Sequence, residues 1–444
     1  MLISRFQTII ALLLALVAAP LGAQERPVIE IDVSGGVIEP MNIALARFVP
    51  ETPDAGDYAA NIASVITSDL TGTGLFREIP QEAHIGRVES INATIEFADW
   101  RAISAQILVI GSVAASATGE LTVKFRLFDV VTQRPIGDGV QLAGSQLQWR
   151  RMAHKLADTI YTRLTGQGGY FDSRVVFVAE NGPKDARLKR LAVMDYDGAN
   201  LQFLTDDSAI VLAPRFAPNA RDVLYTSYEN GAPQVFLLNL DTGQRQVLLA
   251  DALNMTFAPR FAPDGASVVM SMEQGGNTDL YSVNLATREA TRLTTDGSID
   301  TAPSYAPDGS RIAFESDRSG GQQIYVMPAG GGEAVRISNG EGRYATPVWS
   351  PRGDLIAFTK ILAGRFHIGV MNVDGTGERL LTESFLDEAP TWAPNGRVLM
   401  FFRETAGENG APQIFSVDLS GRTMRMVPTA GNFASDPAWS GLLR

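Results

Sequence analysis

One short phrase recurs six times in the C-terminal two-thirds of the chain, and it constrains the fold more than any other feature. It reads proline, any residue, an aromatic residue, then alanine or serine, and it begins at Pro214, Pro259, Pro303, Pro347, Pro390 and Pro437. The intervals are 45, 44, 44, 43 and 47 residues. Each interval holds short strand-like runs separated by turn residues, such as 312–316, 323–327 and 334–338. Repeats of this length built from strands and turns predict a β-propeller.

The count of repeated parts predicts a closed ring of six blades. Six units have a strand-like run at equivalent places, from residues 175–179 to residues 399–403. The phrase also occurs six times, but the phrases and the units are out of step by one strand. The first unit has no phrase before it, and the last phrase has no strands after it. We therefore predict that the C-terminal strand completes the blade that begins at Arg174. Such closure leaves no free sheet edge in the ring.

The chain before the repeats predicts a small α+β domain over residues 36–168. Residues 41–48, 107–113 and 121–127 have strand patterns, whereas apolar residues recur at helical spacing over 58–70 and 149–164. Glycines at 166, 168 and 169 mark a linker, so we place the propeller at 169–444. The predicted fold class is an α+β N-terminal domain followed by an all-β six-bladed β-propeller closed by the C-terminal strand.

The N-terminus is typical of an exported protein. Within residues 1–23, Arg5 is the only charge and residues 9–19 form an apolar run that is too short for a membrane anchor. We expect a signal peptide that is cleaved near Ala23. Residues 24–35 then form a tail with alternating apolar positions, which is typical of a strand that pairs with its own sheet or with a partner.

Composition excludes several classes of function. The formal net charge is −12, whereas nucleic-acid binding requires clustered lysine and arginine, so we expect no nucleic-acid partner. No later segment is long and apolar enough to span a bilayer, so we expect no direct membrane insertion. The chain has no cysteine, which rules out disulfides, a thiolate nucleophile and cysteine-based metal sites.

A search for catalytic and metal-binding motifs predicts no enzyme. The chain has no Gly-x-Ser-x-Gly, His-Glu-x-x-His or Walker-type motif. Its three histidines, at 84, 154 and 367, fall in different predicted elements, and we expect His154, beside Lys155 on a helix, to be solvent-exposed. Residues 195–200 place glycine fourth rather than sixth, which favours a turn over an EF-hand calcium loop.

Acidic residues precede the repeated prolines, as in Asp300, Asp387, Glu388 and Asp436. In a propeller these residues lie on loops that lead to the innermost strands, so we expect them to ring one mouth of the central channel. Each aspartate could cap a local turn through backbone N–H groups. Alternatively, the ring could bind a partner's basic loop or a divalent cation such as Ca²⁺ in the channel.

One aromatic residue occupies the same place in every repeat. We expect these side chains to pack between adjacent blades, and a row that stacks on sugars is the alternative. The set comprises Phe216, Phe261, Tyr305, Trp349, Trp392 and Trp439.

The order of these parts resembles the TolB family of the Tol-Pal system. The stretches that carry the resemblance are 107–113 (ILVIGSV), 121–132 (LTVKFRLFDVVT), 193–198 (VMDYDG) and 385–390 (FLDEAP), and it covers essentially the whole mature chain. It implies a non-enzymatic periplasmic adaptor without a cofactor. Such an adaptor binds the outer-membrane lipoprotein Pal at one propeller mouth and inner-membrane TolA through its N-terminal tail, together with other Tol-Pal components. The implied roles are outer-membrane invagination during cell division and envelope integrity.

The resemblance also implies two sets of contact residues. Those facing Pal precede the repeated prolines: Met255, Phe257, Ala258, Asp300, Thr301, Ala302, Tyr344, Thr346, Leu386, Asp387 and Glu388. Those facing TolA lie in the tail: Pro27, Val28, Ile29, Ile31 and Val33. The chain departs from the family pattern at residues 255–257, which are more apolar than the family's usual loop, and at Asn219 and Ala220, which replace Asp-Gly in the first phrase.

Two other classes of function remain as alternatives. A secreted propeller hydrolase or lyase would use paired carboxylates at the mouth, and sequence spacing does not exclude such a pair. A glycan-binding lectin would use the six aromatic residues of the repeats.

Overall fold

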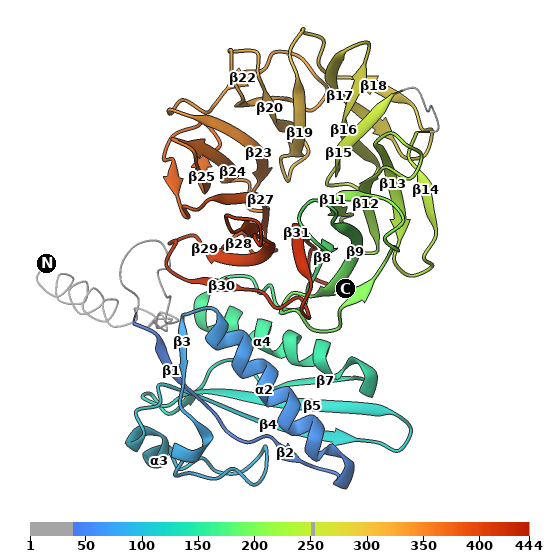
Figure 1. Cartoon of the computed structure of the whole chain (residues 1–444). Coiled ribbons are helices and arrows are strands. Elements are labelled where there is room, and N and C mark those ends of the chain that lie inside the picture. The colour runs from blue at the N-terminus through green and yellow to red at the C-terminus, as the bar shows by residue number, and fades with distance from the viewer. Residues whose placement is uncertain (1–38, 250–253, 444) are drawn as a thin grey trace, which may run out of the picture.

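The computed structural model describes residues 39–249 and 254–443. The predicted signal peptide and the tail, with Pro27, Val28, Ile29, Ile31 and Val33, lie outside the described residues. The chain forms a mixed α/β domain that lies against the side of a ring of β-sheets (Figure 1). The predicted fold class is confirmed.

The N-terminal domain is built on one seven-stranded sheet. Its main path runs β3-β1-β4-β5-β6, while β2 pairs with β4 and β7 pairs with β5. The pairs that β1 makes with β3 and β4 are parallel, whereas β5 is antiparallel to β4. The strands are β1 (Met41–Leu45), β2 (Val49–Pro50), β3 (Phe76–Glu78), β4 (Ile107–Ala115), β5 (Glu120–Asp129), β6 (Arg134–Pro135) and β7 (Val140–Ser145). The strand predicted at 41–48 is thus shorter than expected, because the chain leaves the sheet between β1 and β2.

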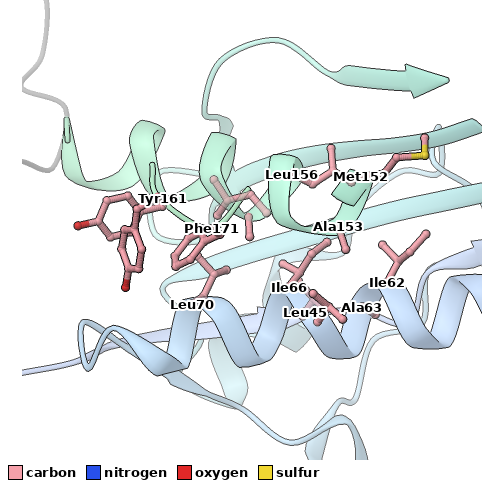
Figure 2. Packing of buried hydrophobic residues seen from close by; sticks show 14 of the residues in the cluster. Leu45, Ile62, Ala63, Ile66, Leu70, Met152, Ala153, Leu156, Tyr161 and Phe171 are labelled. Atoms are coloured by element: carbon pink, nitrogen blue, oxygen red, sulfur yellow. The ribbon is translucent and has the colours of Figure 1, made fainter. Parts of the chain in front are cut away.

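Two long helices, α2 (Gly56–Gly72) and α4 (Trp149–Thr165), cover one face of this sheet. Both were predicted from their apolar spacing. Ile62 and Ile66 of α2 lie beside Leu156 of α4 in a buried cluster above the sheet (Figure 2). The other face packs against the short helix α3 (Phe97–Ala102) through Trp100. Three 3-10 turns complete the domain: η1 (Pro53–Ala55), η2 (Gln81–Ala83) and η3 (Gln146–Gln148).

Six four-stranded sheets form the ring, each with its innermost strand at the channel. Every innermost strand contacts the innermost strands of both neighbouring sheets, so the ring closes (Figure 1). In order from the channel outward, the sheets are β31 (Phe433–Trp439), β8 (Arg174–Asn181), β9 (Leu188–Asp195) and β10 (Gln202–Phe203); β11 (Val211–Phe216), β12 (Asp222–Ser227), β13 (Gln234–Asn239) and β14 (Arg245–Val247); β15 (Met255–Phe261), β16 (Ser267–Gln274), β17 (Asn277–Asn284) and β18 (Ala290–Arg292); β19 (Asp300–Tyr305), β20 (Arg311–Ser316), β21 (Gln323–Pro328) and β22 (Val335–Arg336); β23 (Arg343–Trp349), β24 (Leu355–Leu362), β25 (Arg365–Asn372) and β26 (Arg379–Leu380); and β27 (Leu386–Trp392), β28 (Val398–Glu404), β29 (Pro412–Asp418) and β30 (Met424–Met426).

The C-terminal strand closes the ring as predicted. Strand β31 pairs with β8, and the register places Trp439 opposite Val175 and Phe433 opposite Glu180. The indole Nε1 of Trp439 donates a hydrogen bond of 2.8 Å to Oγ of Ser173. The last and first strands of the propeller are therefore joined by main-chain and side-chain bonds.

The repeated aromatic residues divide into two groups. The tryptophans at 349, 392 and 439 are buried, and Trp392 Nε1 donates to the carbonyl oxygen of Val348 in the preceding blade at 2.9 Å. Trp349 packs among Ala306 and Ile324 of the preceding blade. Packing between blades therefore describes the tryptophans, whereas Phe216, Phe261 and Tyr305 are half-buried.

The segment between the two domains is held by side chains of the propeller. The side-chain oxygen Oε1 of Gln167 accepts hydrogen bonds of 3.1 Å from both Arg352 and Arg397. The carbonyl oxygen of Gly168 accepts one from Asn395, also at 3.1 Å. The glycine-rich linker is thus tied to turns of the propeller.

Candidate functional site

Six residues with left-handed backbone mark one end of the channel. They are the residues immediately before the repeated prolines: Ala213, Ala258, Ala302, Thr346, Ala389 and Asp436, with φ between 47° and 53°. At each of these places the register between the innermost strand and its neighbour shifts, so each innermost strand carries a β-bulge. Bulges end regular pairing and redirect the chain. We call the end of the channel formed by these residues the pre-proline mouth.

Apolar side chains surround the pre-proline mouth. Ile299 is 53% exposed, Ile210 is 50% exposed and Met255 is 39% exposed, and each lies four positions before a repeated proline. Leu386 and Phe433 occupy the same place in two further blades, where they are half-buried, and Phe385 beside Leu386 is exposed. The sixth blade has Arg343 there. Five of six blades therefore present an apolar residue, and we call this set the apolar rim.

Two of the predicted acidic contacts are not available to a partner. The side chains of Asp300 and Asp387 are both fully buried. The guanidinium group of Arg318 donates to both carboxylate oxygens of Asp300 at 2.9 Å, and Arg403 donates to both oxygens of Asp387 at 2.7 Å. The expectation that these carboxylates bind a basic loop or a cation is wrong, because each already has an internal arginine.

The remaining mouth carboxylates have different roles. Asp436 accepts the N–H of Ala213 in the adjacent blade at 3.1 Å, which agrees with the expectation of a backbone cap. Glu388 is half-buried, and its pKa is raised to about 7 by burial and then by the charges of Asp436, Glu315 and Glu404. Several carboxyl groups therefore lie close together at the mouth, and their mutual repulsion adds to the effect of burial on the pKa of Glu388.

The other predicted Pal-facing residues fall into exposed and buried positions. Tyr344 is fully buried, and its hydroxyl group lies between Lys360 Nζ at 2.7 Å and Glu378 Oε2 at 2.6 Å. It therefore presents no surface at the mouth. The half-buried members of the set are Phe257, Ala258, Thr301, Ala302, Thr346, Leu386 and Glu388. Ile210, Ile299 and Phe385 were not predicted as contact residues. For Ile210 and Ile299, the constant spacing of four positions before the repeated proline could have identified them.

None of the described carboxylates of the channel belongs to a cluster of three possible metal ligands. Among the described residues, one group of three has its ligating atoms within 4.8 Å of one another, and it consists of Asp69, His154 and Asp197. That group lies between the domains, and the guanidinium group of Arg150 already pairs with Asp197 there. The charge of Asp197 is therefore already paired with a cationic side chain.

His154 lies at the centre of this interdomain cluster, so the prediction of a solvent-exposed His154 is wrong. Only 1% of its surface is exposed, and its Nδ1 lies 2.7 Å from Oδ2 of Asp69. The hydroxyl group of Tyr196 in the propeller donates to the other oxygen of Asp69 at 2.6 Å. Burial lowers the pKa of His154, but the hydrogen bond to Asp69 and the charges of Asp69 and Asp197 outweigh it, so the pKa is raised.

Comparison with known proteins decides the family. Residues 29–136 match the family described as the TolB amino-terminal domain, and residues 161–443 match the TolB beta propeller domain. The chain belongs to the TolB family. It is 62% identical over 435 residues to the Tol-Pal system protein TolB of Cereibacter sphaeroides (strain ATCC 17029), which covers 98% of this chain and 97% of that one. It is 59% identical to the protein of the same name from Dinoroseobacter shibae, over 96% and 95% of the two chains.

A solved TolB structure has the same fold. The crystal structure of TolB from Acinetobacter baumannii superposes with a TM-score of 0.80 at 27% identity, over 91% of this chain and 97% of that one. The hydrolase, lyase and lectin alternatives are not favoured by these similarities. Of the helices in residues 39–249 and 254–443, none has the length and apolar character needed to cross a membrane.

Proposed function

We propose that this TolB-family chain is a non-enzymatic periplasmic adaptor of the Tol-Pal system. It binds the lipoprotein Pal at the pre-proline mouth and TolA through the N-terminal tail, and so takes part in outer-membrane invagination during division and in envelope integrity. The observation that carries the proposal is the apolar rim around a mouth whose backbone is irregular in all six blades. Exposed apolar residues that gather in one place are typical of protein-binding surfaces.

The chemistry of the mouth fits a folded protein better than a small substrate. Apolar residues from several blades surround the acidic channel lined by Glu388, Glu315 and Asp436. A partner that covers the rim would bury these side chains and could place a basic or hydrogen-bonding group over the channel. Glu388, Thr301 and Thr346 would then supply polar contacts inside the apolar contact area.

We further propose that the chain is divided into the signal peptide at 1–23, the tail at 24–35, the α+β domain at 36–168 and the propeller at 169–444. After cleavage near Ala23, the tail would be free to add as a strand to a sheet of TolA. In that mode main-chain hydrogen bonds give affinity, while Val28, Ile31 and the other apolar residues of the tail give selectivity.

The rim is tested by measuring the affinity of the mature chain for purified Pal. Ile210→Glu combined with Ile299→Glu should weaken binding by at least roughly tenfold, because both side chains would place a charge in an apolar contact. Val335→Glu is the matched control: Val335 is 58% exposed on the outer strand β22 and should leave the affinity within about twofold. An unchanged dissociation constant in the double variant would exclude the rim.

The tail is tested separately. Deletion of residues 24–33 should abolish TolA binding and leave Pal affinity within a few-fold, because the two surfaces are distinct. Loss of both interactions would contradict a separable tail. Capture of a polysaccharide instead of these proteins from an envelope extract would favour the lectin alternative.

A further inference from the structure

The second residue of each repeated phrase lines the other end of the channel. These six residues share a cavity of about 610 Å³ that is also bordered by the Pro-Asn-Gly and Pro-Asp-Gly turns, and we call it the turn-side cavity. Four of them are short and uncharged, whereas two neighbouring blades have arginine. The set is Arg215, Arg260, Ser304, Val348, Thr391 and Ala438.

The two arginines have no acidic hydrogen-bond partner among residues 39–249 and 254–443. Arg215 donates from Nη1 to the carbonyl oxygen of Pro214 at 2.6 Å, and Arg260 makes no hydrogen bond or ion pair with any described residue. Burial lowers the pKa of Arg215, although the negative charge of Asp436 acts in the opposite direction. Burial also lowers the pKa of Arg260 well below its usual value, and the charge of Arg215 lowers it further. Both arginine side chains are half-buried. Two neighbouring cations therefore lie at the cavity without a hydrogen bond to any carboxylate of the described residues, while the charge of Asp436 acts on Arg215.

Two other blades carry a hydrogen-bond acceptor at the position of the arginines. Ser304 Oγ accepts the N–H of Trp349 in the next blade at 3.0 Å, and Thr391 Oγ1 accepts the N–H of Trp439 at 3.2 Å. A side chain at this position of the ring therefore reaches the N–H of the next aromatic residue. Arg215 and Arg260 occupy the same position before Phe261 and Tyr305, but they bring donors instead of an acceptor. In these two blades the ring therefore carries a guanidinium donor where Ser304 and Thr391 carry a hydroxyl acceptor.

We propose that Arg215 and Arg260 bind an oxyanion, either a carboxylate or a phosphate-like group, in the turn-side cavity. The planar guanidinium group is suited to bidentate contacts with both kinds of anion, and two of them can hold one anion from adjacent blades. The cavity volume lies within the range of small-molecule sites. The cavity is bordered by the turns that follow the innermost strands, whereas the apolar rim lies where those strands begin, so the proposal does not rest on Pal binding at the mouth.

Calorimetric titration of the mature chain with inorganic phosphate, and separately with succinate, tests this site. At least one probe should bind saturably at a single site, and Arg215→Gln combined with Arg260→Gln should weaken that binding by at least roughly tenfold. Tighter binding of phosphate would indicate a phosphate-like ligand, and tighter binding of succinate would indicate a carboxylate ligand. Arg221→Gln is the matched control, because the Arg221 side chain is 70% exposed on the propeller surface. It should bind as the unmodified chain does.

A second readout guards against a folding defect. In dilute Tris-chloride buffer the double glutamine variant should melt no lower than the unmodified chain, because neither arginine forms a salt bridge with a described residue that the substitution would break. Phosphate or succinate should raise the melting temperature of the unmodified chain more than that of the variant. Arg215→Lys combined with Arg260→Lys keeps the positive charge but loses the planar guanidinium group that makes bidentate contacts. This variant should bind the anion more weakly than the unmodified chain does. If neither probe binds saturably, or if the glutamine variant binds equally well, the site does not exist.

Discussion

Asp387 and Arg403 face each other directly across the pairing of β27 with β28, and two hydrogen bonds of 2.7 Å join the carboxylate to the guanidinium group. Asp387 is fully buried, and its Oδ2 also accepts the hydroxyl group of Thr382 at 2.6 Å. Asp300 and Arg318 form a similar pair two blades away. Aspartates at this place in the repeat therefore hold the loop at the mouth to its own blade.

Replacing Asp387 by lysine should destabilise the propeller strongly. The change leaves Arg403 without its partner and buries a second positive charge, and the loss of a buried pair typically costs about 3–5 kcal/mol. Urea unfolding measures this loss. Glu383→Lys is the control, because the Glu383 side chain is 62% exposed and pairs only with exposed Arg365. That change should alter the free energy of unfolding by about 0.5 kcal/mol or less. Equal stability of Asp387→Lys and the unmodified chain would show that the buried pair is not structural.

Glu388→Gln should make the chain more stable at pH 8 and leave its stability nearly unchanged at pH 4.5. The pKa of Glu388 is raised from 4.5 to about 7 in the folded chain, so between these values the folded state binds more protons than the unfolded state. The free energy of unfolding therefore decreases as the pH rises through this window. The Glu388→Gln variant lacks the titrating carboxyl group and should not show this decrease. The gain at pH 8 is at most about 3 kcal/mol. Unfolding curves across this pH range measure it, and a gain independent of pH would contradict the assignment.

Removal of residues 433–444 should abolish cooperative unfolding of the propeller near its normal temperature. The truncation deletes β31, which supplies the innermost strand of the sheet that contains β8. Trp439→Ala is the milder test. Trp439 is 8% exposed and its indole group donates a hydrogen bond to Ser173, so loss of this side chain should lower the free energy of unfolding by about 3–5 kcal/mol. Calorimetry of both variants measures the effect. Unchanged melting of the truncated chain would mean that the ring is stable when open.

The sequence predicted the architecture better than the site, and the reason is physical. Blade number and closure follow from a local phrase that recurs at a fixed interval, so they can be counted. The burial of Asp387 depends on Arg403, which lies 16 residues away on the next strand. The burial of His154 depends on Asp69, at a separation of 85 residues. Neither partner is visible in the local pattern, and an acidic residue in a loop is usually exposed.

The apolar rim is an intermediate case. Ile210 and Ile299 are exposed, and each lies immediately before the first residue of an innermost strand, three positions before the bulge residue. Their offset from the repeat is constant, so alignment of the six units would have found them. The sequence did not reveal the left-handed bulge at Ala302 and its equivalents, which interrupts the regular pairing inside each innermost strand.

The interdomain cluster should make the stability of the chain depend on pH through His154. Its pKa is raised in the folded chain, so its contribution is complete below the unfolded value of about 6.5 and is lost as the pH rises through the folded value. Burial also raises the pKa of Asp69, which favours retention of the shared proton. His154→Gln should therefore cost about 1–3 kcal/mol at pH 6 and less at pH 9.

Urea unfolding at the two pH values measures this difference, and Arg425→Gln is its matched control. Arg425 donates from Nη2 to the carbonyl oxygen of Thr71 at 3.0 Å, so it joins the same two domains without a group that titrates between pH 6 and 9. Its loss should cost the same at both values. If His154→Gln also cost the same at both, the protonated His154–Asp69 pair would not be what links the α+β domain to the propeller. If only His154→Gln depends on pH, that pair is the titrating contact of the interface.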